Sequence, residues 1–201
     1  MSRNKKVSES LFQFMNLLIA LLMKNGQYRT SLHYRATLNS FKRYRDNQDI
    51  ALSEIDADVM RSYEAYLHHT AKVCSNTSSF YLRILRATYN KAVAKGLTPQ
   101  QHPFREVYTG IAQTRKRAIS TESVSQIKRL ESVKELSPKE EMARDTFLMS
   151  FYLRGISFID LAHLRKSDLK DDYLHYTRSK TSQRLTIRWE KEMQELLEKY
   201  Q

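Results

Sequence analysis

Arginine and asparagine side chains recur along residues 76–95, a segment with the spacing of a helix. Arg83, Arg86 and Asn90 share one face of this expected helix, opposite a face of tyrosine, leucine and alanine side chains. No acidic residue occurs between positions 77 and 105. A solvated charged face is the simpler interpretation, but such a face normally mixes signs. A cationic face without carboxylates suits the phosphates of a nucleic acid, and we expect it to bind DNA.

The charge of the whole chain favours the same class of partner. The sequence has 34 Lys and Arg against 22 Asp and Glu, a net charge of +12. Such a balance indicates a polyanionic partner, with nucleic acid ahead of an anionic membrane surface. An RNA-binding or membrane-surface protein stays open as an alternative. The candidate DNA-binding residues are Arg43, Arg45, Thr77, Arg83, Arg86, Asn90, Lys91, Arg115, Lys116 and Arg117.

The sequence lacks the motifs of several other classes of functional site. The sequence contains no glycine-rich phosphate loop, no H-E-x-x-H and no G-x-S-x-G. The single cysteine, Cys74, excludes an internal disulfide and a cysteine zinc site, and a reducing, cytoplasmic location is the natural expectation. His68 and His69 are expected at a solvated helix end rather than on a metal. The apolar run at 11–23 is too short to span a bilayer, so no membrane partner is expected.

Helices are expected to position most of these residues. Only 4 Gly and 3 Pro occur in 201 residues, which argues against a turn-rich β fold. The apolar spacing predicts four helices in the first half, at about 9–24, 31–47, 54–69 and 76–95. Two capping boxes are expected at their starts, Ser10 with Gln13 and Ser53 with Asp56.

The second half is expected to mix helices with a small antiparallel sheet. Ser137 and Pro138 predict a helix start, and Ser157 with Asp160 predicts a short helix. Alternation of polar and apolar residues over 173–188 predicts a hairpin with its turn near 180–183, before a final helix from about 190. The expected organisation is a helical domain at 1–112, a basic linker at 113–120 and an α+β part at 121–201.

Three segments resemble one protein family. Residues 143–168, A-R-D-T-F-L-M-S-F-Y-L-R-G-I-S-F-I-D-L-A-H-L-R-K-S-D, resemble the first conserved box of tyrosine recombinases of the phage-integrase type. The similarity looks closest to integrases of Bacteroides-type mobile elements. Residues 178–181, R-S-K-T, resemble the hairpin that carries the family's catalytic lysine, and residues 76–92 resemble the last long helix of its SAM-like core-binding domain. The resemblance implies a mainly helical core-binding domain followed by the front part of a catalytic domain.

The resemblance also implies an activity and the residues that perform it. Members of the family cut and rejoin DNA through a phosphotyrosine, as a homotetramer on double-stranded core sites and without metal or cofactor. Arg154 would clamp the phosphate, and Lys180 would protonate the leaving 5′ hydroxyl. Alignment on Asp160 puts the family's usual arginine at Ser157, three residues after Arg154, so Arg154 and a neighbour of Ser157 stay open as the first catalytic arginine. Asp160 is expected to orient the arginine or to cap the helix.

The later catalytic motifs of the family have no counterpart in the sequence. A downstream H-x-x-R, a further His or Trp and a nucleophilic tyrosine are required. The H-x-x-R strings at 102–105 and 175–178 are expected to be coincidental, and Tyr200 follows no such box. We therefore expect an N-terminal portion of a recombinase, which binds DNA without cutting it. The alternative is a truncated, non-catalytic regulator that binds DNA.

Overall fold

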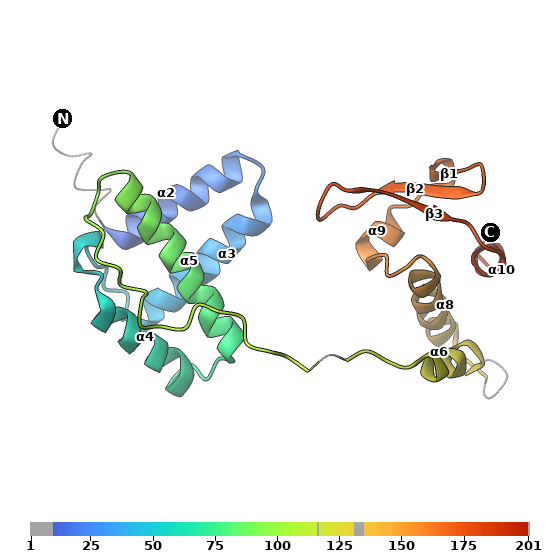
Figure 1. Ribbon diagram of the computed structural model, residues 1–201, viewed down its shortest axis with the longest axis horizontal. Helices are drawn as coiled ribbons and strands as arrows, with labels where there is room; N and C mark the ends of the chain where they lie inside the picture. The colour runs from blue at the N-terminus through green and yellow to red at the C-terminus, as the bar shows by residue number, and fades with distance from the viewer. Residues whose placement is uncertain (1–9, 116, 131–134, 201) are drawn as a thin grey trace. The chain divides into compact units, whose positions relative to one another are not determined.

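The chain folds into two compact units. The computed structural model describes residues 10–115, 117–130 and 135–200. The units are Met1–Arg115 and Lys116–Gln201, so the division falls inside the segment 113–120. The first unit is helical, and the second combines helices with a small antiparallel sheet (Figure 1). The predicted fold class, mainly helical with a small antiparallel sheet, is confirmed.

Four α-helices and one 3₁₀ helix build the described part of the first unit, residues 10–115, around one core. In order these are α2 (Leu11–Lys24), α3 (Tyr28–Tyr44), the 3₁₀ helix η1 (Leu52–Glu54), α4 (Ala57–His69) and α5 (Ser75–Ala94). Helix α5 packs against both α3 and α4, while α2 packs against α3. Phe41, Tyr63 and Leu82 are fully buried among them. Burial of the apolar face of α5 leaves its polar face for other partners.

The predicted starts of two helices are wrong in their capping residues. Ser10 precedes α2 but does not cap it, because its hydroxyl binds the carboxylate of Asp49. Helix α4 begins at Ala57 rather than near 54, and the Asp56 carboxylate accepts a hydrogen bond from the Val59 amide at 2.9 Å. Asp56 is therefore the N-cap itself and not the third residue of a box. The spacing of residue types could not reveal either error, because Ser10 with Gln13 and Ser53 with Asp56 both have the spacing of a capping box.

The chain returns along α5 after that helix ends. We call residues 97–112 the return segment. The Tyr89 hydroxyl donates to the carbonyl of Pro99 at 2.8 Å, and Ser79 lower on the helix donates to Gly110. At the start of the helix, the Asn76 side chain both accepts from the Ala112 amide at 2.8 Å and donates to its carbonyl at 3.2 Å. The return segment therefore runs antiparallel to α5 (Figure 1).

The second unit places a three-stranded sheet beside short helices. Its elements are α6 (Thr121–Lys128), α8 (Pro138–Tyr152), α9 (Phe158–Ala162), η2 (Lys166–Asp168), β1 (Leu169–Lys170), β2 (Tyr173–Thr177), β3 (Arg184–Arg188) and α10 (Lys191–Glu198). The strands are antiparallel in the order β1-β2-β3. Leu174 lies opposite Ile187, and both are buried with Leu153, Ile156 and Met193.

The helix starts predicted in this unit are confirmed. The Ser137 amide donates to the Glu140 carboxylate at 3.0 Å, and the Glu140 amide donates back to the Ser137 hydroxyl at 3.4 Å. Pro138 occupies the first helical position of α8. Throughout residues 10–115, 117–130 and 135–200, no helix combines the length and apolar character needed to cross a membrane.

Candidate nucleic-acid interface and catalytic residues

Two of the predicted DNA-binding side chains lie where α5 meets the return segment. Arg86 is exposed and donates through Nη1 to the Thr109 hydroxyl at 2.7 Å. Asn90 is also exposed, and its side-chain oxygen accepts from the Gln100 amide group at 3.3 Å. The structure thus brings Arg86 and Asn90 together on one polar edge of the first unit. The return segment, whose path the helical pattern did not predict, supplies Thr109 and Gln100 as the partners of these two side chains.

Arg83 lies on the same helix in a more enclosed position. Its side chain is half-buried, and its buried Nε has no hydrogen-bond partner among the described residues. Arg45, just after α3, is half-buried in the same way with an unpartnered Nε. A buried donor without a partner is costly, so both groups gain from an incoming acceptor.

Lys91 turns toward another neighbour. Its Nζ lies 3.1 Å from the Tyr34 hydroxyl and 5.2 Å from the centroid of that ring, which ties α5 to α3. Thr77, in the first turn of α5, has its hydroxyl 3.2 Å from the Cys74 sulfur. Lys91 and Thr77 therefore already have partners within the first unit, unlike a purely solvated charged face.

The remaining predicted basic residues lie at the ends of elements. Arg43 is exposed in the last turn of α3. Arg115 and Arg117 are exposed in the segment between the units, and Lys116 lies outside the described residues.

Arg154 occupies a tight turn between α8 and α9. Its φ is +56° and that of Gly155 is +81°, both in the left-handed region. The Gly155 amide donates to the Ser150 carbonyl at 2.8 Å, which closes the end of α8. The Arg154 side chain is exposed and makes no hydrogen bond or ion pair with any described residue. A non-glycine residue in this conformation costs about 1 kcal/mol.

Lys180 lies at the turn that joins β2 to β3, as predicted. Backbone hydrogen bonds of 2.8 Å from Arg178 to Gln183 and from Ser182 to Arg178 close the turn. The Lys180 side chain is exposed, and no described residue pairs with it. A lysine held this way by its backbone and free at its ammonium group is available to an external acceptor.

Asp160 joins the two segments that carry Arg154 and Lys180. One carboxylate oxygen accepts from the Ser179 amide at 3.0 Å, and the other accepts from the Ser157 hydroxyl at 2.7 Å. These hydrogen bonds, with a further contribution from Arg178, lower the pKa of Asp160 to about 2. Ser157 is the N-cap of α9, as predicted, since its hydroxyl accepts from the Asp160 amide, whereas the Asp160 carboxylate binds the Ser157 hydroxyl and not a backbone amide of the helix start. The bond to the hairpin was not predicted.

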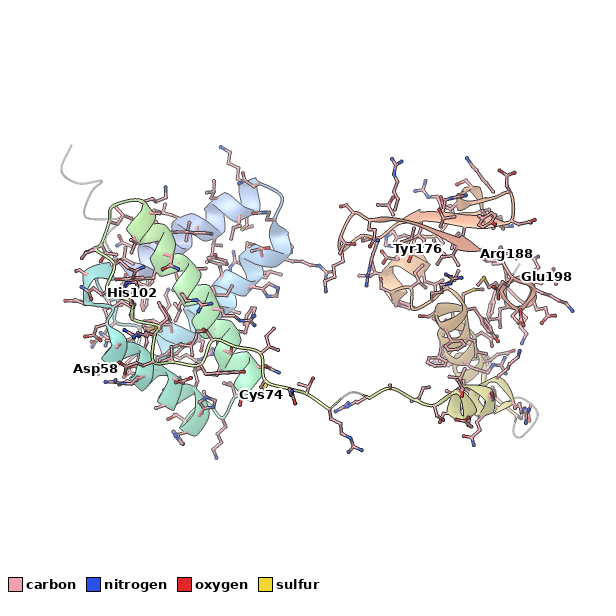
Figure 2. The ribbon with its side chains drawn as sticks, viewed as in Figure 1. Asp58, Cys74, His102, Tyr176, Arg188 and Glu198 are labelled. Atoms are coloured by element: carbon pink, nitrogen blue, oxygen red, sulfur yellow. The ribbon has the colours of Figure 1, made fainter. Side chains whose placement is uncertain are left out.

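A cavity of about 520 Å³ lies beside Asp160, between α9 and strands β2 and β3. Its walls include His163, His175 and Tyr176, the last of which is labelled in Figure 2. Burial, followed by the negative charge of Asp160, raises the pKa of Tyr176. His175 Nδ1 lies 3.0 Å from the Thr186 hydroxyl, so this histidine is used within the sheet. In the described ranges, no three His, Cys, Asp or Glu side chains gather into a possible metal site.

Tyr200 has a partner on α8. Its hydroxyl donates to Asp145 at 3.0 Å, and the other oxygen of that carboxylate accepts from Arg144 Nε at 2.6 Å. Burial and the hydrogen bond to Asp145 raise the pKa of Tyr200 to about 12. The Tyr200 hydroxyl therefore connects the residues after α10 to α8.

Comparison with known proteins finds a family similarity in the first unit. Residues 10–108 match the family model described as the phage integrase SAM-like domain. No curated protein matches the sequence significantly.

Solved structures of lambda integrase match across both units. A tetramer bound to a Holliday junction gives a TM-score of 0.73 at 19% identity, covering 94% of this chain and 54% of that chain. A dimer bound to a COC′ core site gives 0.72 at 17% identity, covering 94% and 53%. The chain thus spans about half the length of these two proteins. Residues 10–108 are similar to the phage integrase SAM-like domain, and the chain has the fold of lambda integrase over the part it covers.

Proposed function

We propose that the chain is the core-binding domain and the front part of the catalytic domain of a tyrosine recombinase that binds double-stranded DNA core sites. The observation that carries the proposal is the fold, which agrees with DNA-bound lambda integrase over 94% of this chain. The SAM-like domain match and the net charge of +12 support the same partner. Assembly as a homotetramer on paired sites, and an origin in a Bacteroides-type mobile element, belong to the same proposal.

The proposed reaction is site-specific cleavage and rejoining of a DNA strand. A tyrosine hydroxyl loses its proton to water as its oxygen attacks the scissile phosphate; a bond forms from that oxygen to phosphorus, and the bond from phosphorus to the 5′ oxygen breaks. Arg154 stabilises the charge that gathers on the phosphate oxygens, and Lys180 gives its proton to the leaving 5′ oxygen. Asp160 is a positioning residue, because it fixes Ser179 directly before Lys180. The family pattern places the nucleophilic tyrosine downstream of these segments.

The DNA-binding part of the proposal is tested with the chain itself. Arg83→Ala and Arg86→Ala should each weaken binding to a duplex of about 30 base pairs and flatten its salt dependence. Loss of one phosphate contact reduces the slope of log K against log salt by about 0.9. Fluorescence anisotropy between about 50 and 300 mM salt measures both quantities.

Lys191→Ala is the matched control, because Lys191 is 86% exposed on α10 and, among the described residues, pairs with Glu195 alone, at 3.5 Å. It removes the same charge from a different place. If the two arginine variants bind like this control, the α5 face is not the DNA-binding surface. Equal affinity of the unaltered chain for duplex DNA, single-stranded RNA and anionic vesicles would overturn the proposed function.

A further inference from the structure

A second cavity, of about 260 Å³, lies between α5 and the return segment. Arg86 and Asn90 line it from the helix, while Gln100, His102 and Arg105 line it from the return segment. Figure 2 labels His102 on this part of the chain. The cavity thus adds three residues from outside the helix to two that the sequence already singled out.

Tyr89 fixes the position of the return segment next to this cavity. Its side chain is 1% exposed, its hydroxyl donates to the Pro99 carbonyl and it accepts from the Gln101 amide at 3.2 Å. Its ring also meets the buried ring of Phe104 edge-on, with 6.2 Å between centroids. The backbone that lines the cavity is therefore ordered without a ligand, and this pre-organisation reduces the loss of conformational entropy on binding.

Most of the side-chain polar groups left over in the cavity are hydrogen-bond donors, and they come from Arg86 and Arg105. The side-chain oxygen of Gln100 accepts from the His102 amide at 3.0 Å, and the side-chain oxygen of Asn90 accepts from Gln100. Both amide oxygens are thus occupied. Arg86 gives one nitrogen to Thr109 and keeps its other donors, and the Arg105 side chain has no partner among the described residues.

No carboxylate lines the cavity. The sequence has no acidic residue from 77 to 105, and the next one, Glu106, has its carboxylate bound to Arg61. The charges of Arg86 and Arg105 are therefore not neutralised by a carboxylate of the cavity that both line. Two guanidinium groups with free donors in a concave, carboxylate-free site favour a tetrahedral oxyanion.

We propose that this cavity binds a phosphate group, and that its source is a phosphodiester of the DNA strand that lies along α5. The inference rests on the proposed function for the source of the phosphate. Arg105 becomes a DNA-binding residue, with Arg86 as its partner across the cavity, and His102 and Gln100 contribute to the wall. The volume is several times the roughly 30 Å³ that one water occupies in the liquid, so a phosphate group has room.

The first arm of the test measures duplex binding by the whole chain. Arg105→Ala should weaken binding about tenfold at 100 mM salt and reduce the salt slope by about 0.9, since one charged contact to phosphate is lost. Arg105→Lys should recover part of the affinity, because it restores the charge without the bidentate geometry. Arg129→Ala is the control, as Arg129 is exposed after α6 in the second unit. Thermal unfolding checks that each variant is folded.

The second arm adds inorganic phosphate and follows the backbone amides by ¹⁵N-edited NMR. Shifts at His102 and Arg105 that Arg105→Ala abolishes support a phosphate site. Those shifts together with unchanged duplex affinity in Arg105→Ala would overturn DNA as the source. If Arg105→Ala matches Arg129→Ala in both arms, the cavity is not a phosphate site, while normal duplex binding by the unaltered chain would leave the proposed function standing.

Discussion

At the scale of single residues, Arg154 departs from the pattern of the family it resembles. The usual arginine position is occupied by Ser157, whose hydroxyl both caps α9 and binds Asp160. Arg154 lies three residues earlier in a left-handed conformation, with its side chain exposed and unpaired among the described residues. A backbone conformation of this kind at an exposed arginine has a cost that a functional role can explain.

In a longer form of the enzyme that cleaves DNA, Arg154→Ala should reduce cleavage at least about 100-fold, because one stabilising donor at the phosphate is lost. Duplex affinity should stay within about twofold of the unaltered enzyme, since one contact among many is removed. Single-turnover cleavage of a suicide substrate and anisotropy measure the two quantities. Arg129→Ala serves as the control, and cleavage retained in Arg154→Ala would return the role to the neighbours of Ser157.

At the scale of elements, Asp160 joins α9 to the β2–β3 hairpin by a hydrogen bond. The hydrogen bond from Ser179 crosses 19 residues of sequence. Because the hydrogen bonds lower the pKa of Asp160 to about 2, the carboxylate form is favoured by the folded state. Its contribution is complete above the ordinary pKa of about 3.9 and is lost only as the pH falls through about 2.

The Ser179 amide resonance should therefore stay constant from pH 8 to pH 4 and then move with a midpoint near pH 2. Asp160→Asn should abolish this pH response and speed hydrogen exchange at Ser179, because the charged acceptor is gone. Asp171→Asn, in the exposed turn between β1 and β2, is the control. A midpoint near pH 4 in the unaltered chain would show that Asp160 does not hold the hairpin.

Sequence reasoning predicted the elements better than the contacts between them. The capping box of Ser137 and Glu140 and the hairpin around Lys180 follow from local patterns, and the structure confirms both. The path of the return segment does not follow from such patterns, because Asn76 and Tyr89 hold it through hydrogen bonds to its backbone. Backbone carbonyls and amides are the same in every sequence, so these contacts leave no trace in the spacing of residue types.

The same reason explains what was missed at the site. The spacing of Ser157 and Asp160 predicts a helix start. No residue near them in the sequence predicts the hydrogen bond from Ser179 to Asp160. His102 and Arg105 have the spacing of an H-x-x-R string that is expected to be coincidental, so the sequence predicts no role for them. Only the fold of the return segment brings them to the cavity that Arg86 lines.

At the scale of the whole molecule, the excess of positive charge is uneven. Residues 1–112 have 16 Lys and Arg against 8 Asp and Glu, while residues 113–201 have 18 against 14. Electrostatic attraction to DNA should therefore come mostly from the first unit. On the proposed function, the second unit, with Arg154 and Lys180 exposed, would then reach DNA that is bound by the first unit.

The segment 113–120, whose described residues form neither helix nor strand, makes that second encounter intramolecular. On the proposed function, a short tether confines the second unit to a local concentration in the millimolar range near bound DNA, and this concentration falls with about the −3/2 power of tether length. Lengthening the segment fourfold with Gly and Ser should thus weaken duplex binding by the whole chain about eightfold. Anisotropy at fixed salt measures the change, and unchanged affinity would mean that the second unit adds nothing to binding. On the proposed function, the length of this segment would in that way set how often the second unit samples the DNA.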